Sequence, residues 1–146
     1  MNNVATLEKM HLLKLYGMER AFKALLESTQ DRSLSSDELL AHVTEAEWDD
    51  RRNRKTRRLT RAAGFRTRAA FPEIDFSIDR GLDRNDFMRL SDCSWVTAGK
   101  NLVISGPTGV GKSYLAQSLG SQACTLGHRT LYFNCAKLFQ TLKDKR

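Results

Sequence analysis

The stretch Gly106-Pro107-Thr108-Gly109-Val110-Gly111-Lys112-Ser113 decides the predicted fold of this chain, because it is a complete G-x-x-x-x-G-K-[ST] motif. The apolar residues at 102–105 predict a short buried strand before it, and residues 114–119 predict a helix with one apolar face after it. A strand, a glycine-rich turn and a helix in this order are typical of a Walker A phosphate-binding loop. The alternative, a glycine turn that happens to carry a lysine, leaves both flanks unexplained.

The residue types of this loop match the chemistry of a nucleoside triphosphate. Glycine lets backbone N–H groups converge on the phosphates, and the N-terminus of the next helix favours an anion. Lys112 is expected to reach the β- and γ-phosphates, and the Ser113 hydroxyl is expected to bind Mg²⁺. The sequence therefore predicts that all eight residues, 106–113, bind ATP. Phe76 or Trp95 could touch the adenine, although core packing is the interpretation that we favour for both.

The residues after the loop contain little of a catalytic site. ATP hydrolysis by this class needs an acidic residue at the end of another strand, and the only acidic residue after Ser113 is Asp144, in a polar stretch. One further strand is predicted at 130–133, followed by a helix from about residue 136. No catalytic residue is assigned.

The predicted fold class is α/β. A small all-α N-terminal domain is expected at 1–68, followed by the first part of a P-loop parallel-sheet domain at 69–146, with Walker A present and Walker B absent. Two parallel strands are fewer than the roughly five of a usual doubly wound sheet. We therefore expect a C-terminally truncated chain, with exposed apolar strand edges and weak ATP affinity.

Local signals divide the first half of the chain into helices. Apolar residues recur at helical spacing in two amphipathic segments, which Gly17 separates. Ser35 and Glu38 form a capping-box signature that begins a third helix. This helix is expected to bury Trp48 as a core anchor and to end at Gly64, a favourable residue after a helix.

Composition limits the class of protein. The 146 residues contain no apolar stretch near the roughly 18 residues of a membrane span, and the N-terminus lacks a signal-peptide pattern. The three cysteines, Cys93, Cys124 and Cys135, show no C-x-x-C spacing, which disfavours a disulfide framework or a zinc site. They are expected to be packing residues, and the chain is expected to be cytoplasmic without membrane contact.

The positive charge is concentrated in one segment. The formal net charge is +7, yet residues 51–68 carry nine basic residues and no acidic one, so the remainder carries −2. Helical spacing would place several of these side chains on one face, and arginine favours bidentate phosphate or carboxylate contacts. The alternative is a solvated helix whose arginines pair with acidic groups elsewhere in the protein. The predicted contacts to a nucleic-acid backbone are Arg51, Arg54, Lys55, Arg58 and Arg61.

Together these features resemble a known family. The stretches 61–65 (Arg-Ala-Ala-Gly-Phe), 74–77 (Ile-Asp-Phe-Ser) and 81–84 (Gly-Leu-Asp-Arg) stand in register ahead of the loop and follow an arginine-rich helix. This order is similar to that of the IstB-like insertion-sequence helper ATPases, relatives of the DnaC helicase loaders within the AAA+ class. The resemblance covers essentially the whole chain.

The resemblance implies a biochemical role. Such proteins bind ATP, form oligomers on duplex DNA, and present the target site to the transposase of the same insertion sequence. It implies that the N-terminal region at 1–68 serves partner contact and assembly. It also implies that nucleotide and Mg²⁺ are bound by Gly106, Gly109, Gly111, Lys112 and Ser113. The family's Walker B pair, sensor and arginine finger have no counterparts here, so ATP hydrolysis by this chain is left open.

Three other functions stay open. A DnaC-like helicase loader would share the loop but favour single-stranded DNA, for which residues 51–68 offer few aromatic stacking groups. A non-enzymatic interaction module with a vestigial loop would bind DNA or a transposase equally well without nucleotide. A small-molecule kinase would leave the basic helical region without a role.

Overall fold

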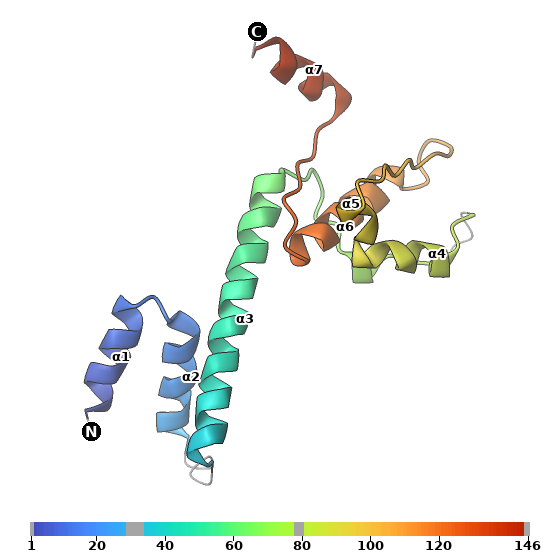
Figure 1. The fold of residues 1–146 in the computed structure, drawn as a ribbon. Coiled ribbons are helices and arrows are strands. Elements are labelled where there is room, and N and C mark those ends of the chain that lie inside the picture. Colours follow the sequence, from blue (N-terminus) through green and yellow to red (C-terminus); the bar gives the residue numbers. More distant parts are fainter. Residues whose placement is uncertain (1, 29–33, 78–80, 145–146) are drawn as a thin grey trace. The chain divides into compact units, whose positions relative to one another are not determined.

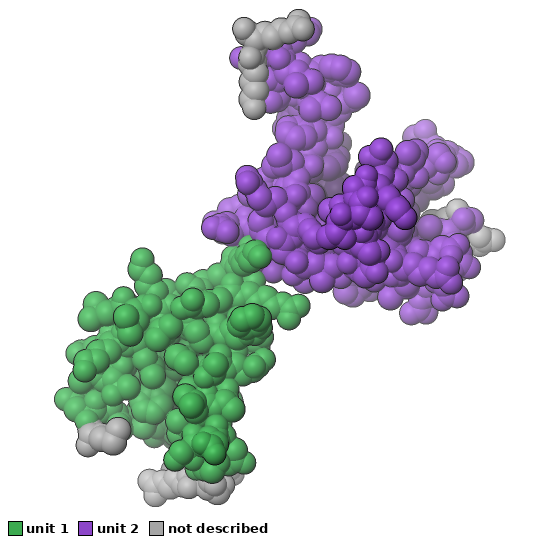
Figure 2. Space-filling model, in the orientation of Figure 1, with its two compact units in different colours: residues 1–55 green, residues 56–146 purple. Residues whose placement is uncertain are grey.

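The structure is a computed structural model that describes residues 2–28, 34–77 and 81–144. The chain forms two compact units, residues 1–55 and residues 56–146 (Figure 2). The boundary between the units lies within the long helix α3, Ser36–Ala63. The domain division predicted at residue 68 stays a prediction.

The first unit contains α1 (Asn3–Leu12), α2 (Tyr16–Glu27) and the N-terminal part of α3 (Figure 1). The predicted capping box begins α3: the Ser35 N–H donates to Glu38 Oε2 at 2.8 Å, and the Glu38 N–H donates to Ser35 Oγ at 3.3 Å. The helix then continues to Ala63, and Gly64 follows it with a φ of +68°. The start of this helix and the residue after its end are thus as the sequence predicted.

Gly17 lies inside α2 and not between the helices, which corrects the predicted interruption. The break between α1 and α2 falls at residues 13–15, where Lys14 has a φ of +59°. A Cβ on Gly17 would lie 2.3 Å from the Ala46 carbonyl oxygen and 2.6 Å from Glu47 Cα. Glycine is therefore required at this position for the backbones of α2 and α3 to approach closely.

Trp48 is not the core anchor that the sequence predicted, because its side chain is 66% exposed. The buried residues of α3 in the first unit are Val43, Glu47 and Asp50, whose spacing places them on one helical face. Trp48 follows Glu47 directly, about 100° further around the helix, and so lies off that face. The position of Trp48 on the helix therefore leaves its large apolar side chain exposed to solvent.

The second unit packs around α6 (Lys112–Thr125). One buried cluster joins Leu115 and Leu119 of α6 to Phe71, Ile74 and Phe87. These three come from the 3₁₀ helix η1 (Phe71–Glu73), the residue that follows it, and α4 (Arg84–Arg89). The remaining helices are η2 (Leu90–Asp92), α5 (Ser94–Thr97) and α7 (Cys135–Lys143).

A second buried cluster packs against the C-terminal end of α6. Leu59 and Ala63 at the end of α3 pack on Cys124, with the half-buried Phe65 beside them. Cys93 is also buried, as the packing interpretation requires, but Cys135 is exposed. Packing therefore accounts for two of the three cysteines.

The predicted α/β fold class is wrong for this structure, because the described residues contain no β-strand. The segments predicted as strands, 102–105 and 130–133, are irregular and form no ladder with each other. Their apolar side chains stay largely open: Val103 is 85% exposed and Leu131 is 68% exposed. Two short segments provide too little hydrogen bonding and burial to hold a parallel pair without further strands. The Tyr132 N–H donates instead to the Ala63 carbonyl at the end of α3, at 2.8 Å.

Over the described part of the chain, no helix is both long and apolar enough to cross a membrane.

Candidate functional site

The glycine-rich motif at residues 106–113, called the glycine loop below, has a backbone that depends on its glycines. Gly106, Gly109 and Gly111 have φ values of +149°, +87° and +90°. Side chains other than hydrogen are strained in this region, so the three glycines permit a turn that most residues would not. The spacing of glycines in the motif therefore corresponds to a local conformational requirement.

The loop ends at the N-terminus of α6, which begins at Lys112. Gly111 precedes the helix and provides no side-chain cap, and the first turn contains no acidic residue. The first N–H groups of a helix have no intrahelical partner, and the helix dipole makes this end favourable for an anion. The N-terminus of α6 thus offers free donors at the position where the motif predicts phosphates.

Lys112 reaches back across the glycine loop. Its Nζ donates to the Gly106 carbonyl at 2.8 Å and also to the Pro107 carbonyl. The ammonium group is therefore held close to the start of the loop by interactions that a phosphate could replace.

Ser113 lies exposed in the first turn of α6, beside Lys112. Mg²⁺ is usually bound in nucleotide sites by few protein oxygens together with phosphate oxygens and waters. The Ser113 hydroxyl fits that donor set. Among the described residues no group of three or more His, Cys, Asp or Glu side chains is placed to hold a metal ion.

Phe76 and Trp95 each make a contact within the second unit. The Phe76 ring lies 6.0 Å from the Phe87 ring, centroid to centroid, beside the first buried cluster. The indole N–H of Trp95 donates to the Leu90 carbonyl at 3.2 Å. The Phe76 contact agrees with the core-packing interpretation of that residue, whereas for Trp95 this interpretation stays a prediction.

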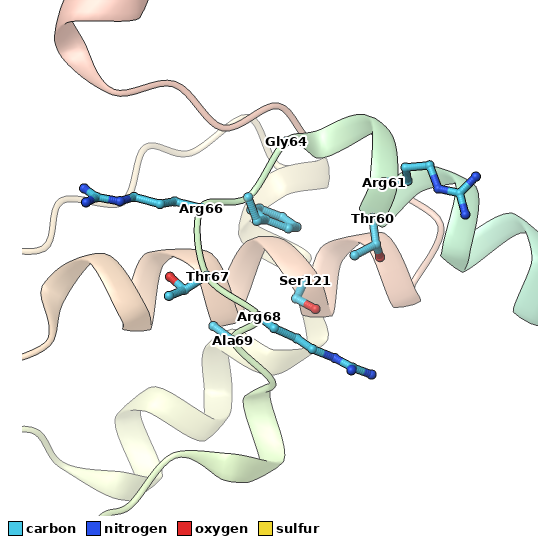
Figure 3. Close-up of a pocket in the computed structure, with 9 residues that line it drawn as sticks. Thr60, Arg61, Gly64, Arg66, Thr67, Arg68, Ala69 and Ser121 are labelled. Atoms are coloured by element: carbon cyan, nitrogen blue, oxygen red, sulfur yellow. The ribbon is translucent and has the colours of Figure 1, made fainter.

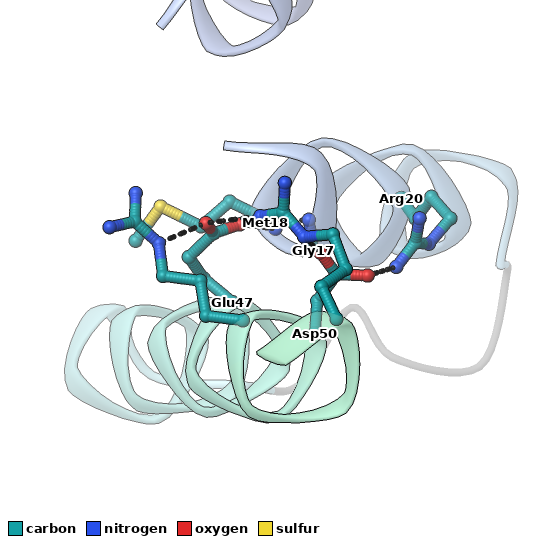
Figure 4. Close-up of polar contacts among 7 residues, drawn as sticks. Gly17, Met18, Arg20, Glu47 and Asp50 are labelled. Carbon is teal, nitrogen blue, oxygen red and sulfur yellow. Dashed lines mark hydrogen bonds and ion pairs between the residues drawn. The ribbon is translucent and has the colours of Figure 1, made fainter. Parts of the chain in front are cut away.

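Two of the predicted nucleic-acid contacts, Arg51 and Arg54, take part in a polar cluster of the first unit (Figure 4). Buried Glu47 is at its centre: Oε2 accepts from the N–H groups of Gly17 at 2.8 Å and Met18 at 3.3 Å. Its Oε1 lies 2.7 Å from Arg51 Nε and 3.7 Å from Arg54 Nη2. Glu47 therefore caps the N-terminus of α2 from the neighbouring helix while it pairs with these arginines.

Buried Asp50 extends the cluster. It accepts a hydrogen bond from the Arg20 guanidinium, and its Oδ2 lies 2.7 Å from Arg54 Nε. The Arg20 hydrogen bond lowers the pKa of Asp50 below its ordinary value despite the opposing effect of burial, and Arg54 adds to this shift. Arg20, Glu47 and Asp50 thus link α2 to α3 in an arrangement that needs both carboxylates ionised.

Burial by itself raises the pKa of Glu47, but its hydrogen-bond donors outweigh that effect. The Arg51 guanidinium and the backbone N–H groups of Met18 and Gly17 leave the pKa below its ordinary value. The carboxylate is therefore charged at neutral pH, as the ion pairs require.

The other predicted contacts are arranged differently. Lys55, Arg58 and Arg61 are exposed, and the described residues provide no ion pair to any of them. The same holds for the neighbouring basic residues Arg52, Arg57, Arg66 and Arg68. Among the described residues, pairing with acidic groups thus accounts for Arg51 and Arg54 and for no other member of the basic segment. Contact with DNA stays a prediction for all five residues.

Sequence reasoning missed the residues that organise these sites. Glu47 and Asp50 each stand four positions before an arginine, a spacing at which ion pairs form on a helix, so a signal was present. Gln117 gave no such signal. It is 2% exposed in α6, and its amide bonds the backbone of Arg66 and Thr67, about 50 residues earlier in the chain.

Comparison with known proteins gives a consistent result. The family described as "IstB-like ATP binding protein" matches residues 8–146. "Putative insertion sequence ATP-binding protein y4pL" of Sinorhizobium fredii is 40% identical over 137 residues, which cover 94% of this chain and 56% of that protein. "Insertion sequence IS1162 putative ATP-binding protein" of Pseudomonas fluorescens is 34% identical over 139 residues, covering 94% of this chain and 60% of that protein. The chain thus spans little more than half the length of these relatives.

Proposed function

This chain belongs to the family of IstB-like ATP binding proteins, and we propose that it is the ATP-binding helper of an insertion sequence. In this role it assembles on duplex DNA as an oligomer and assists the transposase of the same element. The relatives are named as insertion-sequence ATP-binding proteins. DNA assembly and transposase assistance are the steps that the proposal adds.

The observation that carries the proposal is the geometry of the glycine loop. Three glycines with positive φ lead into an uncapped helix N-terminus, and Lys112 is held across the loop. In the proposed role this is a Walker A site: the loop backbone binds the phosphates, Lys112 pairs with them, and Ser113 binds Mg²⁺. Bound Mg²⁺ would neutralise phosphate charge.

The exposed basic residues support the DNA part of the proposal. Lys55, Arg58 and Arg61 retain their positive charge without an ion pair among the described residues, so they can contact phosphates without first breaking one. Such contacts are largely independent of sequence and weaken steeply with salt. The one aromatic residue in this segment, Phe65, is half-buried against α6, which disfavours a single-strand stacking platform.

Binding of a fluorescent ATP analogue with Mg²⁺ tests the nucleotide site. Lys112→Ala should weaken binding by tenfold or more, on the order expected for loss of a charge-assisted contact to phosphate. Lys100→Ala is the matched control, since Lys100 is exposed and lies outside the loop, and it should leave the affinity unchanged. Equal loss in both variants, or no loss in Lys112→Ala, would contradict the proposed site.

The DNA part is tested by comparing a duplex with the corresponding single strand, with and without ATP. A preference for the duplex that ATP strengthens is expected. A preference for the single strand would favour a helicase loader instead. Duplex binding that ignores both ATP and the Lys112→Ala substitution would favour an interaction module with a vestigial loop.

A further inference from the structure

A pocket of about 350 Å³ in the second unit contains Arg61, one of the proposed DNA contacts, together with residues to which the proposed function has given no role (Figure 3). It lies where the chain leaves α3 and crosses α6. Its lining combines the end of α3, the segment after it and one residue of α6: Thr60, Arg61, Gly64, Phe65, Arg66, Thr67, Arg68, Ala69 and Ser121.

The lining of this pocket, called the arginine pocket below, is positively charged. Three of its residues are arginines, none is acidic, and no acidic residue occurs anywhere in the sequence from 51 to 72. In Figure 3 the side chains of Arg61 and Arg68 extend toward the same side of the pocket, whereas Arg66 extends toward the opposite side. Arg61 and Arg68 are therefore the two arginines of the lining whose side chains lie on the same side of the pocket.

Two hydroxyl groups add neutral donors. Thr60 and Ser121 lie between Arg61 and Arg68 in Figure 3. Neither hydroxyl makes a hydrogen bond to another described residue, although several Ser and Thr hydroxyls elsewhere bond a nearby carbonyl. Both can consequently donate to a ligand at no cost in existing contacts.

Buried Gln117 fixes the segment that carries Arg68. Its Oε1 accepts from the N–H groups of Arg66 at 2.8 Å and Thr67 at 3.0 Å, and its Nε2 donates to Thr67 Oγ1 at 2.9 Å. Nε2 also donates to the Ser113 carbonyl at 3.0 Å. The backbone of the pocket is therefore held on α6, which reduces the entropy that a bound ligand would otherwise have to remove.

We propose that the arginine pocket binds one phosphate group of the DNA backbone, with Arg61 and Arg68 as charged donors and the Thr60 and Ser121 hydroxyls as neutral donors. Guanidinium groups bind phosphate through paired N–H donors, and hydroxyls complete such sites. The proposal rests on the proposed function, which supplies duplex DNA as the source of the phosphate. It identifies a defined site among the exposed basic residues, and Arg68 was not among the predicted contacts.

The test measures the affinity of the full chain for a fluorescein-labelled 20-base-pair duplex of mixed sequence, over a series of salt concentrations. Arg61→Gln and Arg68→Gln should each weaken binding roughly tenfold and lower the salt slope by about one. Arg66→Gln removes the same charge from the same segment and should weaken binding only about twofold, because this side chain extends away from the other two. Equal effects of all three substitutions would overturn the proposal, since only net charge would then matter.

A second probe separates failure of the pocket from failure of the proposed function. Inorganic tripolyphosphate is titrated into Lys112→Ala, in which the glycine loop no longer contributes, with and without Arg68→Gln. If the unsubstituted chain does not bind the duplex, the proposed function fails, and loss of tripolyphosphate binding with Arg68→Gln would still support a phosphate site. If the duplex binds equally well to Arg61→Gln, Arg68→Gln and the unsubstituted chain, the pocket proposal fails and the proposed function stands.

Discussion

Replacing Gly17 with alanine should separate α2 from α3 and destabilise the first unit. The added Cβ would lie 2.3 Å from the Ala46 carbonyl oxygen, whereas ordinary contact begins at 3.4 Å. The three close atoms near Gly17, which are the Ala46 carbonyl oxygen and carbon and Glu47 Cα, all belong to the backbone, so no side-chain rotation relieves the clash. The helices must move apart by about 1 Å.

The magnitude follows from what that movement disrupts. Overpacking of this kind costs about 1–3 kcal/mol. It also stretches the bonds from Glu47 to the N–H groups of Gly17 and Met18, and such bonds to a charged group contribute about 1.5–3 kcal/mol. The higher helix propensity of alanine relative to glycine offsets about 1 kcal/mol of this loss. With partial relaxation we expect a net loss of roughly 2–4 kcal/mol in the free energy of unfolding.

Hydrogen exchange measured by mass spectrometry gives a local readout of this change. Peptides from α2 and from the first half of α3 should exchange faster in Gly17→Ala, while those from α6 should be unchanged. Gly120→Ala is the control: its Cβ would meet the ring edge of Phe65 at 2.9–3.0 Å, and a ring can shift. Unchanged exchange in α2 of Gly17→Ala would refute the close approach of the two helices.

Three further results are expected. The folded-state pKa values of Glu47 and Asp50 are lowered, so the ionised carboxylates stabilise the fold fully above their unfolded pKa values near 4, and this stabilisation is lost as pH falls through the folded-state pKa values. The urea midpoint of unfolding should therefore fall between pH 7 and pH 3, and Glu47→Gln should make the midpoint depend less on pH. Gln117→Leu should destabilise the second unit by about 2–4 kcal/mol in urea unfolding, since it leaves the N–H groups of Arg66 and Thr67 unpaired. ATP with Mg²⁺ at 100 times its Kd should stabilise the fold by about 2.7 kcal/mol, and EDTA should remove most of the resulting rise in Tm.

Features that depend on a few consecutive residues could be predicted from the sequence. The capping box at Ser35 and Glu38, and the positive φ at Gly64, are decided by the local backbone and its nearest side chains. The glycines of the glycine loop belong to the same class, because their φ values are a property of the turn itself.

Features that depend on distant partners could not be predicted in this way. A strand exists only where another segment provides its hydrogen bonds, and residues 102–105 and 130–133 have no such neighbour in the described structure. The prediction for Trp48 was wrong because burial depends on which face of α3 meets α2. That face is the one on which Gly17 closely approaches the backbone of Ala46 and Glu47. The role of Gln117 arises from a pairing across about 50 residues, which helical periodicity does not contain.

The basic segment shows how local and distant information combine. Glu47 and Asp50 stand four residues before Arg51 and Arg54 and pair with them, but no acidic residue precedes Arg58 at either three or four positions. The same is true of Arg57 and Arg61, so the compensated charges end near the middle of α3 and the uncompensated ones follow. The uncompensated arginines at 57–68 belong to the same compact unit as the glycine loop. Gln117 bonds both the segment that carries Arg68 and the Ser113 carbonyl, so this one side chain connects the proposed phosphate site to the first turn of α6.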